Sequence, residues 1–552
     1  MLGNSHVQFL GGVSYSVWQQ ALKVKQKKGI LTFQIMKKSR RIYNYSLLYL
    51  ISIVLFISCS STVKTDKFTM YPKPNEKGIN PDTHLKIAFK SKPIIGEKGK
   101  IRIFDSHTDS LVDVIDIGIP AGPTKPRKNP EATYTPEPYE YVSGKFTNAN
   151  TKPGTPSGSA LATADTFQLT IIGGFTDAFH FYPIIVHENT AIIYLHNNLL
   201  EYNKDYYVLI DSTVLSPAEG SFKGIYNKST WRFGTRPSPP DKKQNRLVVN
   251  DKGTGDFNTV QGALDFIPDY CEDTFEIYIK NGLYEELVYF RNKSNIIIRG
   301  ENREKTVIQY ANNEVFNPHP WNIKANEWPG TFPSRRAAFA IDNCTNIQLE
   351  NLTVKTLLKG QAEGLLINGN KTIVKGVNIV GSGDALQTNG SAYFEDVKID
   401  GGGDMILGRG PAFFKNCDFY SPGPFMWIRN TKANHGNVFL NCRFTGTNSN
   451  GSELARAPAN KGSYTYPYSE AVFINCALKN IVPRGWGKVG GETKDVHYWE
   501  YNSTNIDDGE PVDVSQRADF SSQLTMDKDK KLIENYSKPV FVLDGWSPYL
   551  NN

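Results

Sequence analysis

The chain has few cysteines, and none of them has metal-binding spacing. Only six of its 552 residues are cysteine, and five of these follow Cys59. An odd number argues against a complete disulfide framework. No Cys-x-x-Cys pair occurs, which argues against a zinc site, so no metal is expected at these positions. The five are Cys271, Cys344, Cys417, Cys442 and Cys476.

An excess of positive charge is also missing outside the first 58 residues. The formal net charge is +7, but residues 1–58 hold eight Lys or Arg and no Asp or Glu. Removing them leaves 54 basic against 55 acidic residues, a net charge of −1. A folded region without a basic excess binds polyanions poorly, so we expect no nucleic acid partner.

No apolar run has the length of about 20 residues that a membrane-spanning helix needs. The run at residues 46–58 has 13 residues, follows a basic stretch that begins after Met36, and ends at Ser58. This order is typical of an export signal, with Met36 as the expected start. The junction resembles the lipobox of bacterial lipoproteins, which implies that Cys59 carries a lipid. A short membrane anchor is the alternative. We expect an exported, monomeric outer-membrane lipoprotein, held to the membrane by its lipid and facing the periplasm or the cell surface.

Two regions with different patterns follow the signal. Residues 65–237 alternate apolar and polar positions in short runs separated by turn residues, which predicts a β-sandwich. Its opening (NPDTHLKIAFKSKP) and its close (WRFGTRP) resemble bacterial Ig-like domains attached to exported enzymes. Residues 119–160 look like a long insertion. We expect a spacer, with glycan binding as the alternative. A polar, Pro-rich linker at 238–245 leads to the second region, 246–552.

The second region repeats one strand type at intervals of 20 to 34 residues. Repeats of this kind predict a parallel β-helix, in which each coil buries its apolar face only by stacking on its neighbours. A leucine-rich solenoid is disfavoured because its Leu-x-x-Leu-x-Leu pattern is missing. We therefore predict an all-β chain, with an Ig-like β-sandwich before a right-handed parallel β-helix. The expected inward positions are Leu352, Val377, Val397, Cys417, Cys442 and Cys476.

Two carboxylates have the same position in consecutive repeats. Asp384 lies seven residues after Val377, and Asp404 lies seven residues after Val397, in the similar segments GSGDAL and GGGDMI. Equal offsets on adjacent coils place them about 4.8 Å apart along the stack. Two carboxylates this close do not ionise together easily, which provides one proton donor and one anionic nucleophile. The alternative is that both aspartates only bond turn amides.

The second region resembles the pectin methylesterase family over residues 245–549. This resemblance implies a parallel β-helix and hydrolysis of the methyl esters of galacturonate units in pectin, with methanol released. The segments that carry it, with their order and spacing, are NDKGTGDFNTVQGALDFIP (250–268), EIYIKNGLYEELVYF (276–290), NIIIRGENREKTVI (295–308), GQAEGLLINGNKTIVKGVNIVGSGDALQT (360–388), GGGDMILGRGPAFFKNC (401–417), LARAP (454–458), VPRGW (482–486), YWEYN (498–502) and DGWSP (544–548).

The resemblance also implies roles for single residues. Asp404 is the implied nucleophile, and Asp384 protonates the departing methanol and then activates water. Arg456 holds the carboxylate of the nucleophile in its ionised form. Gln361 donates a hydrogen bond to the oxyanion. No metal or organic cofactor is needed, and the substrate is a pectic polysaccharide. Arg484, followed by Gly485 and Trp486, is an alternative to Arg456.

The chain departs from the family pattern at four places. Gly383 replaces the usual Gln before the first Asp, and Met405 replaces the Phe after the second. Ala457 and Pro458 stand where a Trp follows the Arg, and Gln387 replaces an aromatic residue. Met405 and Gln387 are expected to contact substrate together with Trp427 and Trp486. The side chains of Tyr464, Tyr466 and Tyr468 could also stack on sugars, although packing of large aromatics is an equal alternative.

Two other functions remain open at this point. A pectate lyase or polygalacturonase has the same architecture, but a lyase needs a Ca²⁺-binding acidic cluster and a basic proton abstractor. Only Asp400 adds an acidic group near the aspartate pair. A non-catalytic glycan-binding lipoprotein is the other alternative, since one oxyanion donor is missing. A serine esterase is disfavoured because no Gly-x-Ser-x-Gly motif occurs.

Overall fold

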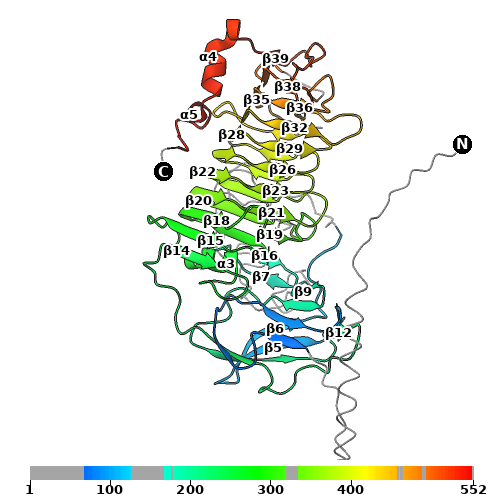
Figure 1. Ribbon diagram of the computed structural model, residues 1–552, viewed down its shortest axis with the longest axis vertical. Coiled ribbons are helices and arrows are strands. Elements are labelled where there is room, and N and C mark those ends of the chain that lie inside the picture. The colour runs from blue at the N-terminus through cyan, green and yellow to red at the C-terminus, as the bar shows by residue number, and fades with distance from the viewer. Residues whose placement is uncertain are drawn as a thin grey trace, which may run out of the picture. The chain divides into compact units, whose positions relative to one another are not determined.

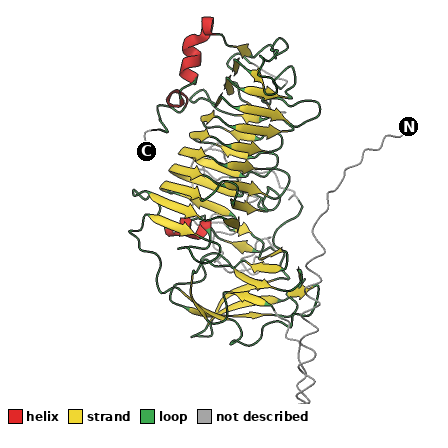
Figure 2. Cartoon of the chain, viewed as in Figure 1, coloured by secondary structure: helices red, strands yellow, loops and turns green. Residues whose placement is uncertain are grey.

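The structure is a computed structural model of the chain (Figure 1). It describes residues 68–125, 167–175, 178–318, 334–456, 459–460, 464–487 and 493–549. Cys59 and the expected export signal lie outside these ranges, as does most of the expected insertion at 119–160. Strands dominate the described part, and the helices are few and short (Figure 2).

The described residues between 68 and 235 form two main sheets that share one apolar core. One sheet has the strand order β1-β3-β10-β9, and the other has the order β2-β13-β11-β5-β6. Trp231 is fully buried between them, and its indole N–H donates to the carbonyl of Pro72 at 2.8 Å. The strands are β1 (Thr69–Tyr71), β2 (Glu76–Ile79), β3 (Leu85–Ala88), β4 (Pro93–Ile95), β5 (Lys100–Asp105), β6 (Leu111–Asp116), β7 (Leu169–Thr170), β8 (Phe179–His180), β9 (Ile184–His187), β10 (Thr190–Ile193), β11 (Asp205–Ile210), β12 (Leu215–Pro217) and β13 (Arg232–Thr235).

From residue 246 onward the strands stack as the coils of a parallel β-helix (Figures 1 and 2). One long ladder is parallel throughout. Its main row is β14 (Arg246–Val249), β15 (Phe275–Ile279), β18 (Ser294–Gly300), β20 (Phe339–Glu350), β22 (Leu365–Lys375), β25 (Ala392–Glu395), β28 (Ala412–Lys415), β31 (Asn437–Leu440), β35 (Glu470–Ile474), β37 (His497–Tyr501) and β39 (Ser522–Gln523). Attached to it are β17 (Val288–Arg291), β24 (Leu386–Thr388), β27 (Ile406–Gly408) and β30 (Met426–Ile428).

A second parallel ladder closes each coil on another side. The two ladders enclose a continuous apolar core, which confirms the predicted stacking. The second ladder consists of β16 (Gly282–Glu285), β19 (Thr306–Tyr310), β21 (Thr353–Thr356), β23 (Asn378–Val380), β26 (Lys398–Asp400), β29 (Asp418–Ser421), β32 (Arg443–Gly446), β36 (Ala477–Lys479) and β38 (Thr504–Asn505). A separate antiparallel pair joins β33 (Ala459–Asn460) to β34 (Tyr464–Thr465).

The predicted inward positions are all in the core. Leu352, Val377, Val397, Cys417, Cys442 and Cys476 are at most 1% exposed. Cys417, Cys442 and Cys476 act as small apolar residues, and all five cysteines of the described ranges are free. Each of these positions directly follows a residue with φ between 51° and 60°, which turns the chain from one ladder to the other. Asn, Asp and Gly tolerate this conformation, and they are the residues found there: Asn351, Gly376, Asp396, Asn416, Asn441 and Asn475.

Three helices complete the described part. The hydroxyl of Thr259 caps α3 (Val260–Phe266) by accepting from the amide of Gly262. α4 (Met526–Tyr536) and α5 (Pro539–Val542) lie at the C-terminal end of the ladder (Figure 1). Within the described ranges, no helix has both the length and the apolar character that a membrane span requires.

Candidate active site

The ladder brings three carboxylates, rather than two, into one row. In the parallel register Leu365 pairs with Leu386, and Leu386 pairs with Ile406. The residue two positions earlier is acidic on each coil: Glu363, Asp384 and Asp404. The two aspartates therefore lie on adjacent coils at the same position, as predicted, and Glu363 precedes them in the row.

Arg456 contacts Asp404 at one end of this row. Its Nη1 donates to Oδ2 of Asp404 at 2.6 Å. The guanidinium also lies 4.2 Å from the ring centre of Trp427, a cation–π contact that fixes its plane. Asp404 has φ of 55°, a conformation uncommon for residues other than glycine. Its side chain keeps 20% exposure, so this carboxylate is both paired and accessible.

Arg336 contacts the other two members of the row, Asp384 and Glu363. Its Nη2 donates to Oδ2 of Asp384 at 2.7 Å, and its Nε donates to Oε1 of Glu363 at 2.7 Å. Burial raises the pKa of Asp384 to about 7, while Arg336 acts against this rise, and Glu363 and Asp404 add to it. Burial also raises the pKa of Glu363, whose side chain is fully buried. Asp384 is thus able to hold a proton near neutral pH.

Gln361 lies beside the row. Its side-chain oxygen accepts a hydrogen bond of 2.9 Å from Nη1 of Arg336. Its backbone carbonyl accepts from the amide of Glu314 at 3.0 Å. The residue is exposed, so its amide is accessible to a ligand next to Asp384.

Trp427 and Trp486, which were both expected to contact substrate, differ in their exposure. Trp427 is half-buried and lies at the site, in contact with Arg456 and with Arg429 at 4.6 Å. Trp486 is fully buried between Phe473 and Tyr498, so the prediction that it contacts substrate is wrong.

The substrate contacts predicted for Met405 and Gln387 are also not available. Met405 is fully buried and points into the core of the β-helix, because it alternates with Asp404 along the chain. Gln387 is 1% exposed, in an outward row with Leu366, Leu407 and Trp427. Neither side chain has a surface for a sugar in this structure.

Two of the three tyrosines can be placed. Tyr466 is nearly buried, makes an edge contact with Trp427 at 5.8 Å, and lies 5.5 Å from the guanidinium of Arg409. Tyr468 lies 6.0 Å from the ammonium of Lys432. The side chain of Tyr464 and the residues Ala457 and Pro458 lie outside the described part.

The geometry also separates the two candidate arginines. Arg484 donates to the backbone carbonyl of Gly487 at 3.0 Å, whereas Arg456 contacts the carboxylate of Asp404 directly. Arg484 instead acts on Glu453: burial raises the pKa of Glu453 and Arg484 lowers it. Arg456 is therefore the guanidinium placed to hold Asp404.

Arg336, Glu363 and Glu453 were not predicted as site residues from the sequence. Glu363 carried a usable signal, because it enters a strand of apolar residues two positions after Gln361 and so needs a buried cationic partner. Arg336 carried little signal, since a basic residue just before a strand is usually exposed.

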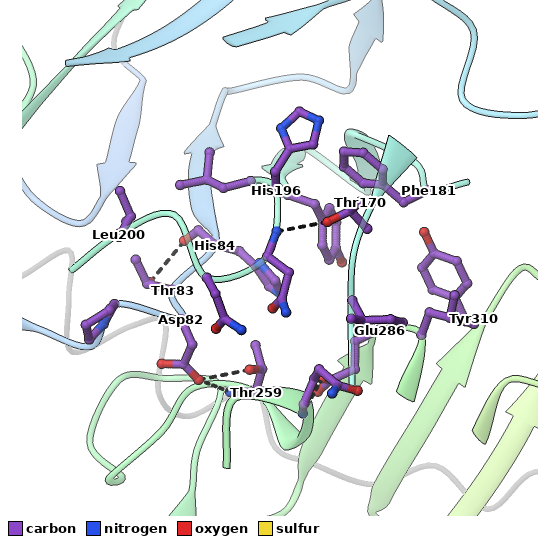
Figure 3. A pocket seen from close by; sticks show the side chains of 18 residues that line it. Asp82, Thr83, His84, Thr170, Phe181, His196, Leu200, Thr259, Glu286 and Tyr310 are labelled. Atoms are coloured by element: carbon purple, nitrogen blue, oxygen red, sulfur yellow. Dashed lines mark hydrogen bonds between the residues drawn. The ribbon is translucent and has the colours of Figure 1, made fainter. Parts of the chain in front are cut away.

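A separate cavity of about 90 Å³ lies between the first sheets and the start of the β-helix (Figure 3). Its acidic groups stabilise α3 and are not arranged for catalysis. Oδ2 of Asp82 accepts from the backbone amide and hydroxyl of Thr259, and Glu286 accepts from the amides of Val260 and Gln261. Burial raises the pKa of Asp82 to about 6 and that of Glu286 to about 7.

The described part of the chain has no group of three or more His, Cys, Asp or Glu side chains that could hold a metal ion. In the acidic row, each carboxylate gives one oxygen to a guanidinium: Glu363 and Asp384 to Arg336, and Asp404 to Arg456. The site thus contains a carboxyl group whose pKa burial raises to about 7, a second carboxyl group held by a guanidinium, and an amide donor.

Comparisons with known proteins show what the chain is similar to. Pectinesterase QRT1 of Arabidopsis thaliana is 30% identical over 312 residues, which cover 52% of this chain and 75% of that protein. Probable pectinesterase 8 of the same plant is 25% identical over 294 residues, covering 50% and 71%. The solved pectin methylesterase from carrot gives a TM-score of 0.45 at 20% identity, covering 54% of this chain and 93% of that one.

A family model described as Pectinesterase matches residues 246–545. This range begins with β14, ends after α5, and includes Asp384, Asp404 and Arg456. It covers more than half of the chain. The chain therefore belongs to the pectinesterase family.

Proposed function

We propose that Asp404 and Asp384 carry out the reaction of this pectinesterase, the hydrolysis of methyl esters of galacturonate units in pectin. The observation that carries the proposal is the contrast between the two neighbours in the acidic row. Asp404 is paired with Arg456 and accessible, whereas burial raises the pKa of Asp384 to about 7. One carboxylate is thus an anion and the other a proton donor, as a nucleophile and a general acid require.

In the first half-reaction, the carboxylate of Asp404 attacks the ester carbonyl carbon. The negative charge that develops on the carbonyl oxygen is stabilised by the side-chain amide of Gln361. The bond from the carbonyl carbon to the methoxy oxygen then breaks, and Asp384 gives its proton to that oxygen. Methanol leaves, and the galacturonyl group stays on Asp404 as a mixed anhydride.

In the second half-reaction, water restores the enzyme. Asp384, now ionised, removes a proton from water while the oxygen attacks the galacturonyl carbonyl carbon. The bond to Asp404 breaks, which regenerates its carboxylate and a protonated Asp384. The product acid gives its proton to solvent. Arg456 holds the carboxyl group of Asp404 in place through both halves.

A product assay on a panel of pectic polymers tests this function. We expect methanol release from methyl-esterified galacturonan, with no rise in the absorbance of unsaturated sugars. Absorbance of unsaturated products without methanol would indicate a lyase instead. Binding without either product would indicate a glycan-binding protein. The panel should include polymers of different methylation, because Gly383, Met405 and Gln387 change the family pattern around the site.

We also propose roles for the other parts of the chain. Residues 68–237 are an Ig-like spacer, and the coil of the β-helix is right-handed, as nearly all parallel crossover connections are. Cys59 carries a lipid that anchors an exported monomer in the outer membrane, which is supported by the apolar run and the basic stretch before it. Metabolic labelling with a radioactive fatty acid tests the anchor, since label should be incorporated by the wild type and not by Cys59→Ala.

A further inference from the structure

Arg336 makes several contacts within the site, and no role has been assigned to it so far. It contacts four acceptors on three segments: Glu314 at 3.2 Å, Gln361 at 2.9 Å, Glu363 at 2.7 Å and Asp384 at 2.7 Å. Its side chain is only 11% exposed. Burial alone would lower its pKa, but Glu363, Asp384 and Glu314 together raise it above the usual range, so the guanidinium stays charged.

The contact with Asp384 determines which of its oxygens can carry a proton. Arg336 can only donate, so Oδ2 of Asp384 accepts its hydrogen bond. The proton of the neutral acid is then on Oδ1. Because Oδ2 is held, the side chain cannot exchange its two oxygens without breaking the contact with Arg336. The O–H bond of the protonated Asp384 therefore points in one fixed direction.

The contact with Gln361 determines the orientation of its amide. The guanidinium donates to the side-chain oxygen, so the NH₂ group of Gln361 points away from Arg336. The NH₂ group makes no hydrogen bond to the described residues, and the side chain is exposed. It is therefore available to an incoming carbonyl oxygen. A donor in this place matters because Gly383 has no side chain that could supply one. A side chain at this position would also be hindered, since a Cβ there would lie 2.6 Å from the carbonyl oxygen of Gly360.

Only a planar guanidinium fits this set of contacts. Nη1 holds Gln361, Nη2 holds Asp384, and Nε holds Glu363. A lysine ammonium is a point charge on a flexible stem and cannot hold three groups in one plane. Glu363 in turn fixes Arg336, because its fully buried carboxylate needs this cation.

We propose that Arg336 is a positioning residue of the reaction, which aims the proton of Asp384 and the amide of Gln361 at the same ester group. This proposal rests on the function proposed above. Arg336 itself does not touch the reacting atoms. Its loss should therefore slow the chemical step while substrate binding stays nearly unchanged.

The test uses the double variant Arg336→Gln, Glu363→Gln, which removes both buried charges together and so avoids leaving one unpaired. We expect kcat for methanol release to fall by about 100-fold, the size of effect that a misplaced catalytic group gives. KM should stay close to the wild-type value, and circular dichroism and thermal unfolding should show a folded protein. A matched control replaces Arg299 and Glu350, an ion pair at 2.8 Å between β18 and β20, by glutamines. That control should keep the wild-type kcat.

The pH profile separates positioning from a structural effect. The charged groups that act on Asp384 are Arg336, Glu363, Asp404 and Arg429. Arg336 lowers the pKa of Asp384 more than Glu363 raises it, so the double variant should move the alkaline limb of kcat/KM to higher pH. Arg336→Lys keeps the charge and should keep the limb, but it should not restore kcat.

The outcomes distinguish the two proposals. A wild-type kcat in a folded double variant, or in Arg336→Lys, would overturn the role of Arg336. An equal loss of kcat in the Arg299 and Glu350 control would also overturn it, because the effect would then be structural. If the wild type itself released no methanol, the function and the role of Arg336 would both fall.

Discussion

At the scale of single residues, the site depends on which carboxylates of the acidic row each of two guanidinium groups contacts. Arg456 contacts Asp404, whereas Arg336 contacts both Glu363 and Asp384. A shared cation compensates each carboxylate less, and both of these are buried. The proton therefore stays on the Arg336 side of the row and the negative charge on the Arg456 side.

The pH dependence of the reaction follows from this division. Burial raises the pKa of Asp384 to about 7, and the proposed mechanism requires Asp384 to be protonated in the free enzyme. As pH rises through about 7, the proton is lost and kcat/KM should decrease. Methanol release measured from pH 5 to pH 9 checks this. A rate that stays constant up to pH 9 would contradict the assignment of Asp384 as the acid.

The choice between the two arginines is tested by one pair of variants. Arg456→Gln removes the partner that orients Asp404, and we expect activity to fall by about 100-fold or more. Arg484→Gln removes a contact with the carbonyl of Gly487 and should leave most of the activity. Methanol release by the two variants is compared at one pH. Loss of activity in Arg484→Gln alone would reverse the assignment.

The sequence could predict the aspartate pair because both members repeat at one offset from an apolar position. It could not predict Arg336, which reaches Asp384 from 48 positions earlier in the chain through a bend that no periodicity marks. The predictions that Trp486 and Met405 contact substrate were also wrong. An aromatic or apolar side chain near a motif can point toward the core or away from it, and one residue of shift in a strand reverses the direction.

At the scale of the structural elements, the six coils from β20 to β36 each have a left-handed residue between their two ladders. The row of apolar positions and the Asn, Asp or Gly before each of them could both be found in the sequence, which is why the β-helix was predictable. Aromatic stacking then adds to the core: the rings of Phe394, Phe414 and Phe439 lie 4.4 Å and 4.8 Å apart.

Substitution of Asn441 tests the importance of this turn. Its φ is 56°, and its side chain is exposed. Asn441→Ala should lower the free energy of unfolding by about 1–2 kcal/mol, because alanine is strained at this φ. Asn441→Gly should be almost neutral, because glycine is not strained there. Denaturant unfolding of both variants measures the difference. Equal stability of the two would show that the left-handed conformation does not matter here.

At the scale of the whole described part, the first sheets are joined to the β-helix by polar contacts and by aromatic packing. Asp82 from the first region accepts from Thr259 of the second, and Phe175 and Phe179 pack against Tyr289. The sequence predicted a linker between the two regions but not this contact. Alternation within a strand indicates which face is buried, and it does not indicate which part of the chain covers that face.

This junction should make stability depend on pH. The pKa values of Asp82 and Glu286 are raised to about 6 and about 7, so the folded state binds more protons than the unfolded chain between about pH 4 and pH 7. Their contribution to stability is present below pH 4 and is lost as pH rises to 7. Replacing them by Asn and Gln should remove this dependence, so the stability of the variant relative to the wild type should rise over this range by on the order of 5 kcal/mol. Thermal unfolding at pH 4, 5.5 and 7 measures it. A constant difference would contradict the account.

The nucleophilic role of Asp404 is tested most directly by Asp404→Asn. The matched control is Asp400→Asn, which changes an exposed carboxylate on β26 four positions earlier. The measurement is methanol release from methyl-esterified galacturonan, with thermal unfolding of each variant beside it. We predict that Asp404→Asn releases no methanol while its stability stays within about 1 kcal/mol of the wild type, and that Asp400→Asn remains active. Continued ester hydrolysis by a folded Asp404→Asn variant would contradict the account.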